Sequence, residues 1–169
     1  MFKKIQAIAL FMLFTISLQS HNGITQLPLC EPQITPVSID RNSVIEYAKS
    51  FIGKPYRYAS ADPVKGFDCS GFVHYVFKNY DINLPRGSRE YKSLGSALKP
   101  EDFKVGDVLV FYGYKDNTQI GHVGIICEAD GMNSKFIHSS SGKAYGVTIS
   151  ELNSEMYTRR FYKCVDVIN

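Results

Sequence analysis

The apolar residues follow two different periods along the chain. Between residues 40 and 94 they recur at intervals of three or four, which is the spacing of amphipathic helices. From residue 107 onward they form short runs rich in β-branched and aromatic residues, and turn residues separate these runs, as is typical of strands. Helices followed by consecutive short strands predict an α+β domain with an antiparallel sheet.

Three helices are predicted in the first of these regions. The first is capped by Asp40 or Asn42 and ends at Gly53. Its apolar stripe consists of Val44, Ile45, Ala48, Phe51 and Ile52. The second helix runs from about residue 69 to 80. The third is short, is capped by Ser88 and reaches about residue 94.

The second region predicts five strands, over residues 108–112, 120–127, 135–138, 147–149 and 161–168. In the second strand, alternation divides the side chains between two faces. One face carries Ile120, His122, Gly124 and Ile126, and the other carries Val123 and Ile125. Glycines weaken a strand, so Gly121 and Gly124 indicate that another backbone or a ligand lies close to it.

Composition and the N-terminal pattern indicate one globular domain behind a targeting segment. The chain has 169 residues, 44% hydrophobic and 21% charged, which is enough for a core of its own. Two lysines precede an apolar run over residues 5–18, which predicts a signal peptide over residues 1–20 rather than an uncleaved anchor. Lipid modification at Cys30 is disfavoured because Leu29 before it is bulky. Residues 21–40 contain three prolines and are expected to form an extended tether, and residues 41–169 the domain.

The targeting segment and the charge balance constrain location and partners. We expect an exported protein, periplasmic or extracellular, with no stable membrane span after signal cleavage. Without Lys3 and Lys4, Lys plus Arg falls from 19 to 17 against 16 acidic residues, so the domain is near +1 and no nucleic-acid partner is expected. The Cys and His residues are scattered rather than at metal-ligand spacing, and there is no glycine-rich phosphate loop. We therefore expect neither a metal nor a cofactor.

Cys69 lies where a loop meets the second helix. At the first turn of a helix, the free N–H groups and the positive end of the dipole favour a thiolate and lower the pKa of a cysteine. Gly66 and Gly71 would leave room for a substrate backbone near the sulfur. A buried structural cysteine is the alternative. The polar, turn-forming neighbours Asp68 and Ser70 favour the nucleophile.

A cysteine nucleophile needs a base and a group that orients the base. Of the four histidines, His21 lies in the predicted tether and His74 lies off the apolar stripe of its helix, which leaves His122 and His138. Because glycines flank His122, a catalytic base is as plausible a role for this residue as a structural one. In a Cys/His/His set, His122 would take the thiol proton and His138 would hold the His122 ring in its productive tautomer.

Two further cysteines lie on predicted strands. Cys127 and Cys164 could pair, because an exported protein permits disulfides, or could be buried thiols. We favour buried thiols.

Several segments, in order along the chain, resemble the NlpC family of cell-wall cysteine peptidases. The most specific are the run FDCSGF at residues 67–72 and the run GHVGI at residues 121–125. Weaker matches lie at residues 53–58, 84–88, 98–111 and 136–139. The resemblance extends over about residues 45–168.

The resemblance implies a papain-like fold, with the nucleophile helix packed on a five- or six-stranded antiparallel sheet. It also implies a monomeric cysteine endopeptidase that hydrolyses peptidoglycan stem peptides, usually between γ-D-glutamate and the diamino acid. Cys69 matches the nucleophile of the family, His122 the base and His138 the third polar residue.

Further positions match the surroundings of the nucleophile in the family. Tyr56 matches a tyrosine near the oxyanion region, and Asp68 and Ser70 match positions that line the substrate subsite. Tyr58 stands where tryptophan is common in the family, and Tyr91 stands near a frequent glutamine. Because of these differences, the resemblance does not determine the shape of the cleft. An amidase or acyltransferase of the same fold, or a non-catalytic wall-binding domain, is the alternative function.

Overall fold

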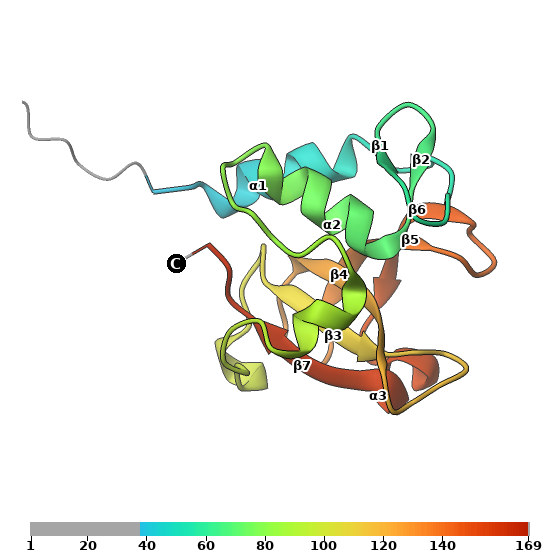
Figure 1. Ribbon diagram of the computed structural model, residues 1–169. Coiled ribbons are helices and arrows are strands. Elements are labelled where there is room, and N and C mark those ends of the chain that lie inside the picture. Colours follow the sequence, from blue (N-terminus) through green and yellow to red (C-terminus); the bar gives the residue numbers. More distant parts are fainter. Residues whose placement is uncertain (1–37, 169) are drawn as a thin grey trace, which may run out of the picture. The chain divides into compact units, whose positions relative to one another are not determined.

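The computed structural model describes residues 38–168 (Figure 1). The predicted signal peptide and nearly all of the predicted tether lie outside the described residues. Within them, helices come first and strands follow, and the family-typical α+β organisation is confirmed. No helix within this described part is both long enough and apolar enough to cross a membrane.

The strands of the C-terminal half form one antiparallel sheet in the order β6-β5-β4-β3-β7. Its members are β3 (Val108–Tyr112), β4 (Ile120–Glu128), β5 (Lys135–Ser140), β6 (Gly146–Glu151) and β7 (Phe161–Val165). All five predicted strands are confirmed. Strand β7 is three residues shorter than predicted, because Asp166 leaves the sheet and accepts a hydrogen bond from the Ile168 N–H at 2.9 Å.

The first two helices also begin where the capping chemistry places them. The Asp40 carboxylate accepts from two N–H groups at the start of α1 (Arg41–Lys49). The Asp68 carboxylate caps α2 (Cys69–Lys78) in the same way. The third helix is a 3₁₀ segment, η1 (Ser88–Lys92), and its capping residue is Gly87, so the prediction of Ser88 as the cap is wrong. Here the Glu90 side chain accepts from the Gly87 N–H at 3.2 Å.

Two apolar clusters occupy the two faces of the sheet. Helices α1 and α2 lie together over one face (Figure 1), where Val73 and Phe77 of α2 share a cluster with Val123 and Ile125 of β4. The second cluster contains Phe111, Phe136 and Tyr157, among others. Tyr157 comes from α3 (Glu155–Arg160), a short helix that the hydrophobic pattern does not predict. The helix packs on the sheet through this single fully apolar contact residue, so it has no apolar period to detect.

Two predicted side-chain positions are wrong. Ile120 packs in the cluster of Val123, on the opposite face from Ile126, because the β3–β4 register shifts at Gly121. Phe111 pairs with His122 but Tyr112 pairs with Ile120, so Gly121 is skipped and the alternation is reset. Ile52 is 52% exposed, because α1 ends at Lys49, before Ile52 can continue its apolar stripe.

A small hairpin that was not predicted leads the chain into α2. Its strands are β1 (Ala61–Asp62) and β2 (Gly66–Phe67). A Cβ on Gly66 would lie 2.3 Å from the Pro55 carbonyl oxygen, and one on Gly71 2.1 Å from that of Ser60. The two glycines therefore admit the protein's own 55–60 segment against the start of α2, and the expectation that they make room for a substrate backbone is wrong.

Candidate active site

Cys69 is the first residue of α2 and lies close to strand β4. Its Sγ is 3.9 Å from the carbonyl oxygen of Gly121, the residue before His122. Only 9% of the Cys69 surface is exposed. The structure thus brings the helix start and the histidine-bearing strand, 52 positions apart in the chain, to one place.

The residues on either side of Cys69 are held by an ion pair. The Asp68 Oδ1 accepts from the Gly71 N–H at 2.6 Å, which caps α2. The Arg86 guanidinium binds the same carboxylate in a bidentate manner, at 3.0 and 2.8 Å, and its Nη1 lies 3.4 Å from the Ser70 hydroxyl. Bidentate pairs of this kind fix orientation as well as contributing energy. Arg86 lies in the family-like segment at residues 84–88, but no role was predicted for it.

His122 and His138 contact each other directly. The His122 Nε2 is 2.9 Å from the His138 Nδ1, and the two rings are almost perpendicular at 89°. On its far side the His138 Nε2 lies 2.9 Å from the Ser150 hydroxyl and 3.4 Å from the Tyr157 hydroxyl. Ser150 and Tyr157 were not predicted, because β6 and α3 bring them to His138 and neither belongs to a motif. His74 is elsewhere, with its Nδ1 2.8 Å from the Leu84 carbonyl oxygen.

Burial holds both imidazoles neutral. It lowers the pKa of His138 to about 3, with a further contribution from the Arg160 charge. It also lowers the pKa of His122 well below 6.5, and the charges of His138 and Arg160 act in the same direction. A neutral imidazole keeps one nitrogen lone pair, so near pH 7 the pair is in the protonation state that a general base requires.

The pKa of the Cys69 thiol differs from the value that its position at a helix start predicts. Burial, followed by the negative charge of Asp68, raises the pKa of Cys69, and the hydrogen bonds from the N–H groups of Val123 and Ser70 oppose this only in part. The expectation of a lowered pKa is therefore wrong. Because the resting pair is thiol and neutral imidazole, a thiolate forms only if a neighbouring base takes the proton.

Gly121 lines both a hollow that contains the thiol and a hollow that contains His122. The first has a volume of about 420 Å³ and contains all of the predicted residues near the thiol. These are Tyr56, Asp68, Cys69 and Ser70, joined by Arg86 and Ser88. The second, of about 600 Å³, is lined by His122, Tyr157 and Arg160, and by residues 140–142. His138 lies behind His122 and is fully buried.

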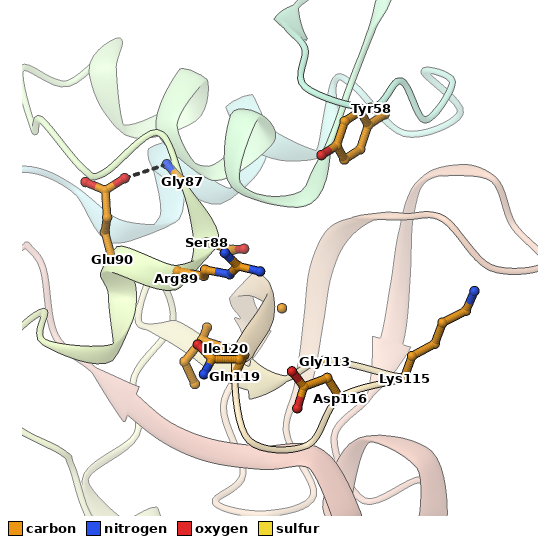
Figure 2. Close-up of a pocket in the computed structure, with 11 residues that line it drawn as sticks. Tyr58, Gly87, Ser88, Arg89, Glu90, Gly113, Lys115, Asp116, Gln119 and Ile120 are labelled. Atoms are coloured by element: carbon orange, nitrogen blue, oxygen red, sulfur yellow. Dashed lines mark hydrogen bonds between the residues drawn. The ribbon is translucent and has the colours of Figure 1, made fainter.

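A third hollow of about 590 Å³ opens beside the first (Figure 2). Tyr58 overhangs it from the loop before α2, Arg89 enters it from η1, and Asp116 enters it from the β3–β4 loop. Tyr58 is 84% exposed, so this side of the site is open and polar rather than enclosed. Tyr56, in contrast, is half-buried, and burial together with the Cys69 and Asp68 charges raises the pKa of its hydroxyl to about 12.

The remaining described cysteines do not join this site. Cys127 and Cys164 are free, buried thiols that belong to different apolar clusters, which confirms the interpretation as buried thiols. No group of three His, Cys, Asp or Glu side chains within residues 38–168 is placed to hold a metal ion.

A helix that begins with a thiol and packs on an antiparallel sheet is the arrangement of the papain-like class of α+β folds. The chain belongs to the NlpC/P60 family, whose model matches residues 53–166. The gamma-DL-glutamyl hydrolase of Bacillus subtilis is 30% identical over 132 residues, 76% of this chain and 30% of that protein. The probable endopeptidase NlpC of Escherichia coli is 34% identical over 116 residues, 68% of this chain and 70% of that protein.

The solved structures agree with this membership. An NlpC/P60 family protein from Bacillus cereus superposes with a TM-score of 0.68 and 29% identity, covering 78% of this chain and 41% of that chain. The chain therefore corresponds to about a third to two-fifths of the B. subtilis and B. cereus relatives, and to a larger share of the E. coli protein.

Proposed function

We propose that this protein is an exported cysteine endopeptidase that hydrolyses peptidoglycan stem peptides at the bond between γ-D-glutamate and the diamino acid. One observation carries the proposal: the hollow that contains the thiol at the start of α2 adjoins, at Gly121, the hollow lined by His122 of the buried, neutral His122–His138 pair. The two relatives, a probable endopeptidase and a gamma-DL-glutamyl hydrolase, support the reaction type. Export rests on the apolar run over residues 5–18.

Cys69 is the proposed nucleophile and His122 the proposed base. His122 takes the thiol proton while the sulfur attacks the γ-glutamyl carbonyl carbon, and the C=O electrons move to the oxygen. When the tetrahedral intermediate collapses, the C–N bond breaks and the protonated His122 gives its proton to the leaving amine. Water then attacks the thioester with His122 again acting as base, which releases the γ-glutamyl carboxylate and restores the thiol.

His138 is the proposed positioning residue for His122. Because the His122 Nε2 faces the His138 Nδ1, the lone pair that accepts the thiol proton must be on the His122 Nδ1. That requires the His122 Nε2–H to donate to His138, and the His138 Nε2–H in turn to donate to the Ser150 hydroxyl oxygen. The hydrogen bonds therefore select the tautomer that the reaction needs.

The first hollow is the proposed seat of the acyl half of the substrate. The Cys69 N–H lies at the free start of α2, where a donor to the developing oxyanion is expected, and the neutral Tyr56 hydroxyl shares the same hollow. Asp68 and Ser70 line it as well, and Arg86 holds both of them in place.

The test is digestion of whole sacculi and of defined stem peptides, with the products identified by mass spectrometry. From free stem peptides wild type is expected to release an alanyl-γ-glutamate dipeptide, and from sacculi it is expected to release the peptide that begins with the diamino acid while alanyl-γ-glutamate stays on the glycan. Cys69→Ala is expected to release neither product. Loss of complete stem peptides from the sugar would indicate an amidase instead, and transfer of the acyl group to an added amine an acyltransferase. No product on any substrate, with Cys69 resistant to alkylation, would overturn the enzyme proposal in favour of a wall-binding domain.

A further inference from the structure

The hollow that His122 lines carries two cationic side chains that the reaction does not use. Among the described residues, the only charged side chains that line it are Lys115, from the β3–β4 loop, and Arg160, from the last turn of α3. Figure 2 shows Lys115 extending out of its loop, away from Arg89. The hollow is therefore electropositive, whereas the neighbouring one, lined by Arg89, Lys115, Glu90 and Asp116, contains both signs of charge.

Arg160 is held rigidly within this hollow. Its Nε donates to the Tyr112 carbonyl oxygen at 2.9 Å. Its guanidinium carbon lies 5.9 Å from the centre of the Tyr114 ring and 6.0 Å from that of the Tyr157 ring. Within residues 38–168, neither terminal nitrogen of Arg160 has a hydrogen-bond partner and no carboxylate forms an ion pair with it. The four N–H donors of these two nitrogens, in their fixed fork, therefore remain available.

Compared with the other half-buried arginines of the described part, Arg160 is unusual in having no carboxylate partner. Of the six arginines in the described part of the chain, three are not exposed: Arg41, Arg86 and Arg160. Arg41 pairs with two carboxylates and Arg86 with one. A half-buried guanidinium costs free energy unless its donors are satisfied, so the pattern points to an anion that arrives from outside.

The position of His122 decides which part of a substrate this anion belongs to. The group that takes the thiol proton later delivers it to the leaving amine, so that amine must lie beside His122. The hollow that contains Arg160 is the one that His122 lines, whereas Cys69 itself lines the adjoining hollow with Tyr56 and Asp68. The residue after the scissile bond therefore faces Arg160.

We infer that Arg160, assisted by Lys115, forms a subsite that binds a carboxylate of the residue on the leaving side of the scissile bond. The inference rests on the proposed function and adds a substrate preference to it. The carboxylate has two sources in a stem peptide: the side chain of a diamino acid with a second acid group, such as diaminopimelate, or the free C-terminus of a short stem. A lysine side chain in the same position would bring a like charge to the subsite and is disfavoured.

Four peptides test the inference and separate the two sources. All begin with L-alanyl-γ-D-glutamate, followed by diaminopimelate with both carboxylates free, by diaminopimelate amidated on the side-chain carboxylate, by diaminopimelate amidated on the C-terminal carboxylate, or by lysine. We expect wild type to cleave the first with about ten- to hundredfold higher kcat/KM than the peptide that lacks the bound carboxylate, the range of a charge-assisted hydrogen bond. Equal rates on all four would overturn the subsite.

Arginine variants then assign the preference to Arg160. Arg160→Gln is expected to abolish the difference between the peptides, and Arg160→Lys to retain part of it. The readout is the ratio between substrates, because removing the Arg160 charge also changes the pKa of His122, and that change affects all substrates alike. Arg159→Gln removes the same charge one residue away, from an exposed side chain that does not line this hollow, and should keep the wild-type ratio. The same loss of preference in Arg159→Gln would indicate a diffuse field rather than a subsite.

A binding measurement keeps this inference separate from the proposed reaction. The Cys69→Ala protein is titrated calorimetrically with the same four peptides, so that no cleavage is needed. Tighter binding of the peptides with the free carboxylate, lost in Cys69→Ala/Arg160→Gln, would support the subsite even if wild type cleaves nothing. Absence of any carboxylate preference in binding would overturn the subsite even if wild type proves to be an endopeptidase.

Discussion

At the scale of single residues, the proposed reaction depends on the hydrogen bond between His138 and His122. His138 presents its Nδ1 to His122, and an asparagine amide oxygen can occupy nearly the same place as that nitrogen. We therefore expect His138→Asn to retain part of the wild-type kcat and His138→Leu to lose about 10²–10⁴-fold, the scale of general-base catalysis. Hydrolysis of the stem peptide with the free diaminopimelate measures both.

The KM values distinguish positioning from substrate binding. Because His138 is fully buried and lines neither hollow, both variants should leave KM close to wild type. Equal activity of the asparagine and leucine variants would contradict the proposed role of His138 in selecting the His122 tautomer.

The same histidine makes the folding stability depend on pH. Its pKa is about 3 in the folded protein and about 6.5 when unfolded, so the unfolded state binds more protons between these values. The stabilisation is present above pH 6.5 and is lost as the pH falls toward 3. At pH 5, His138 alone should cost about 2 kcal/mol of unfolding free energy relative to pH 7.5.

Urea denaturation at pH 7.5 and pH 5 measures this loss. His138→Asn should show a smaller difference between the two pH values than wild type, by about 2 kcal/mol, whatever its stability at pH 7.5. His122, whose pKa is also lowered, accounts for part of the difference that remains. An unchanged pH difference in the variant would contradict the buried, neutral state of His138.

At the scale of secondary-structure elements, the start of α2 depends on a close backbone approach. A Cβ on Gly71 would lie 2.1 Å from the Ser60 carbonyl oxygen, which itself accepts the Asp68 N–H at 2.9 Å. We expect Gly71→Ala to lose about 1–3 kcal/mol of stability, as overpacked sites do, and to lower kcat/KM because the displaced segment carries Tyr56.

Gly142→Ala is the matched control for stability. Its Cβ would meet only the Ser140 hydroxyl at 3.4 Å, in an exposed loop, so a change within about 0.5 kcal/mol is expected. Thermal unfolding of the two variants checks the comparison. If Gly71→Ala were as stable as Gly142→Ala, the prediction would be wrong, because the 55–60 segment could then move without loss of stability.

The elements were predictable where a local rule determines them. Asp40 and Asp68 cap helices because a carboxylate can reach N–H groups two or three residues ahead, and this is visible in sequence. The bulge at Gly121 was not visible, because it depends on which β3 residues pair with the strand. Helix α3 was not visible either, since its apolar contact with the sheet is a single residue, Tyr157.

The residues of the site also divide into those that the sequence predicted and those that it did not. The motifs pointed to Cys69, His122 and His138, and the structure places Cys69 and His122 in adjoining hollows with His138 in contact with His122. Their partners were missed because folding alone brings them near: Ser150 follows His138 by 12 residues on another strand, and Arg160 belongs to the helix that no pattern indicated. Sequence motifs of this kind identify the reacting groups better than the residues that position them or select the substrate.

At the scale of the whole domain, an ion-pair network joins the first helix to the last strand. The Arg41 guanidinium binds the carboxylate of Asp107, before β3, and that of Asp166, after β7. The Asp107 side chain is completely buried. Removing one partner of a buried pair leaves a charge uncompensated, so we expect Arg41→Ala to cost about 3 kcal/mol, the lower end of the usual range because Arg41 is 21% exposed.

Chemical denaturation compares this variant with Arg89→Ala. Arg89 is exposed and forms no ion pair within the described part of the chain, so its removal should change stability by less than about 0.5 kcal/mol. Similar losses in the two variants would contradict a specific role for the network in closing the domain.

The hollow lined by His122 and Arg160 also has a consequence for the order of events. If the leaving peptide occupies it, that peptide covers His122, the proposed base for the water that attacks the thioester. Hydrolysis then has to wait until the first product departs. A guanidinium that holds the departing carboxylate firmly would raise selectivity and at the same time delay turnover. The optimum for such an enzyme is an intermediate affinity for the carboxylate, at which selectivity for the right substrate is balanced against inhibition by the first product.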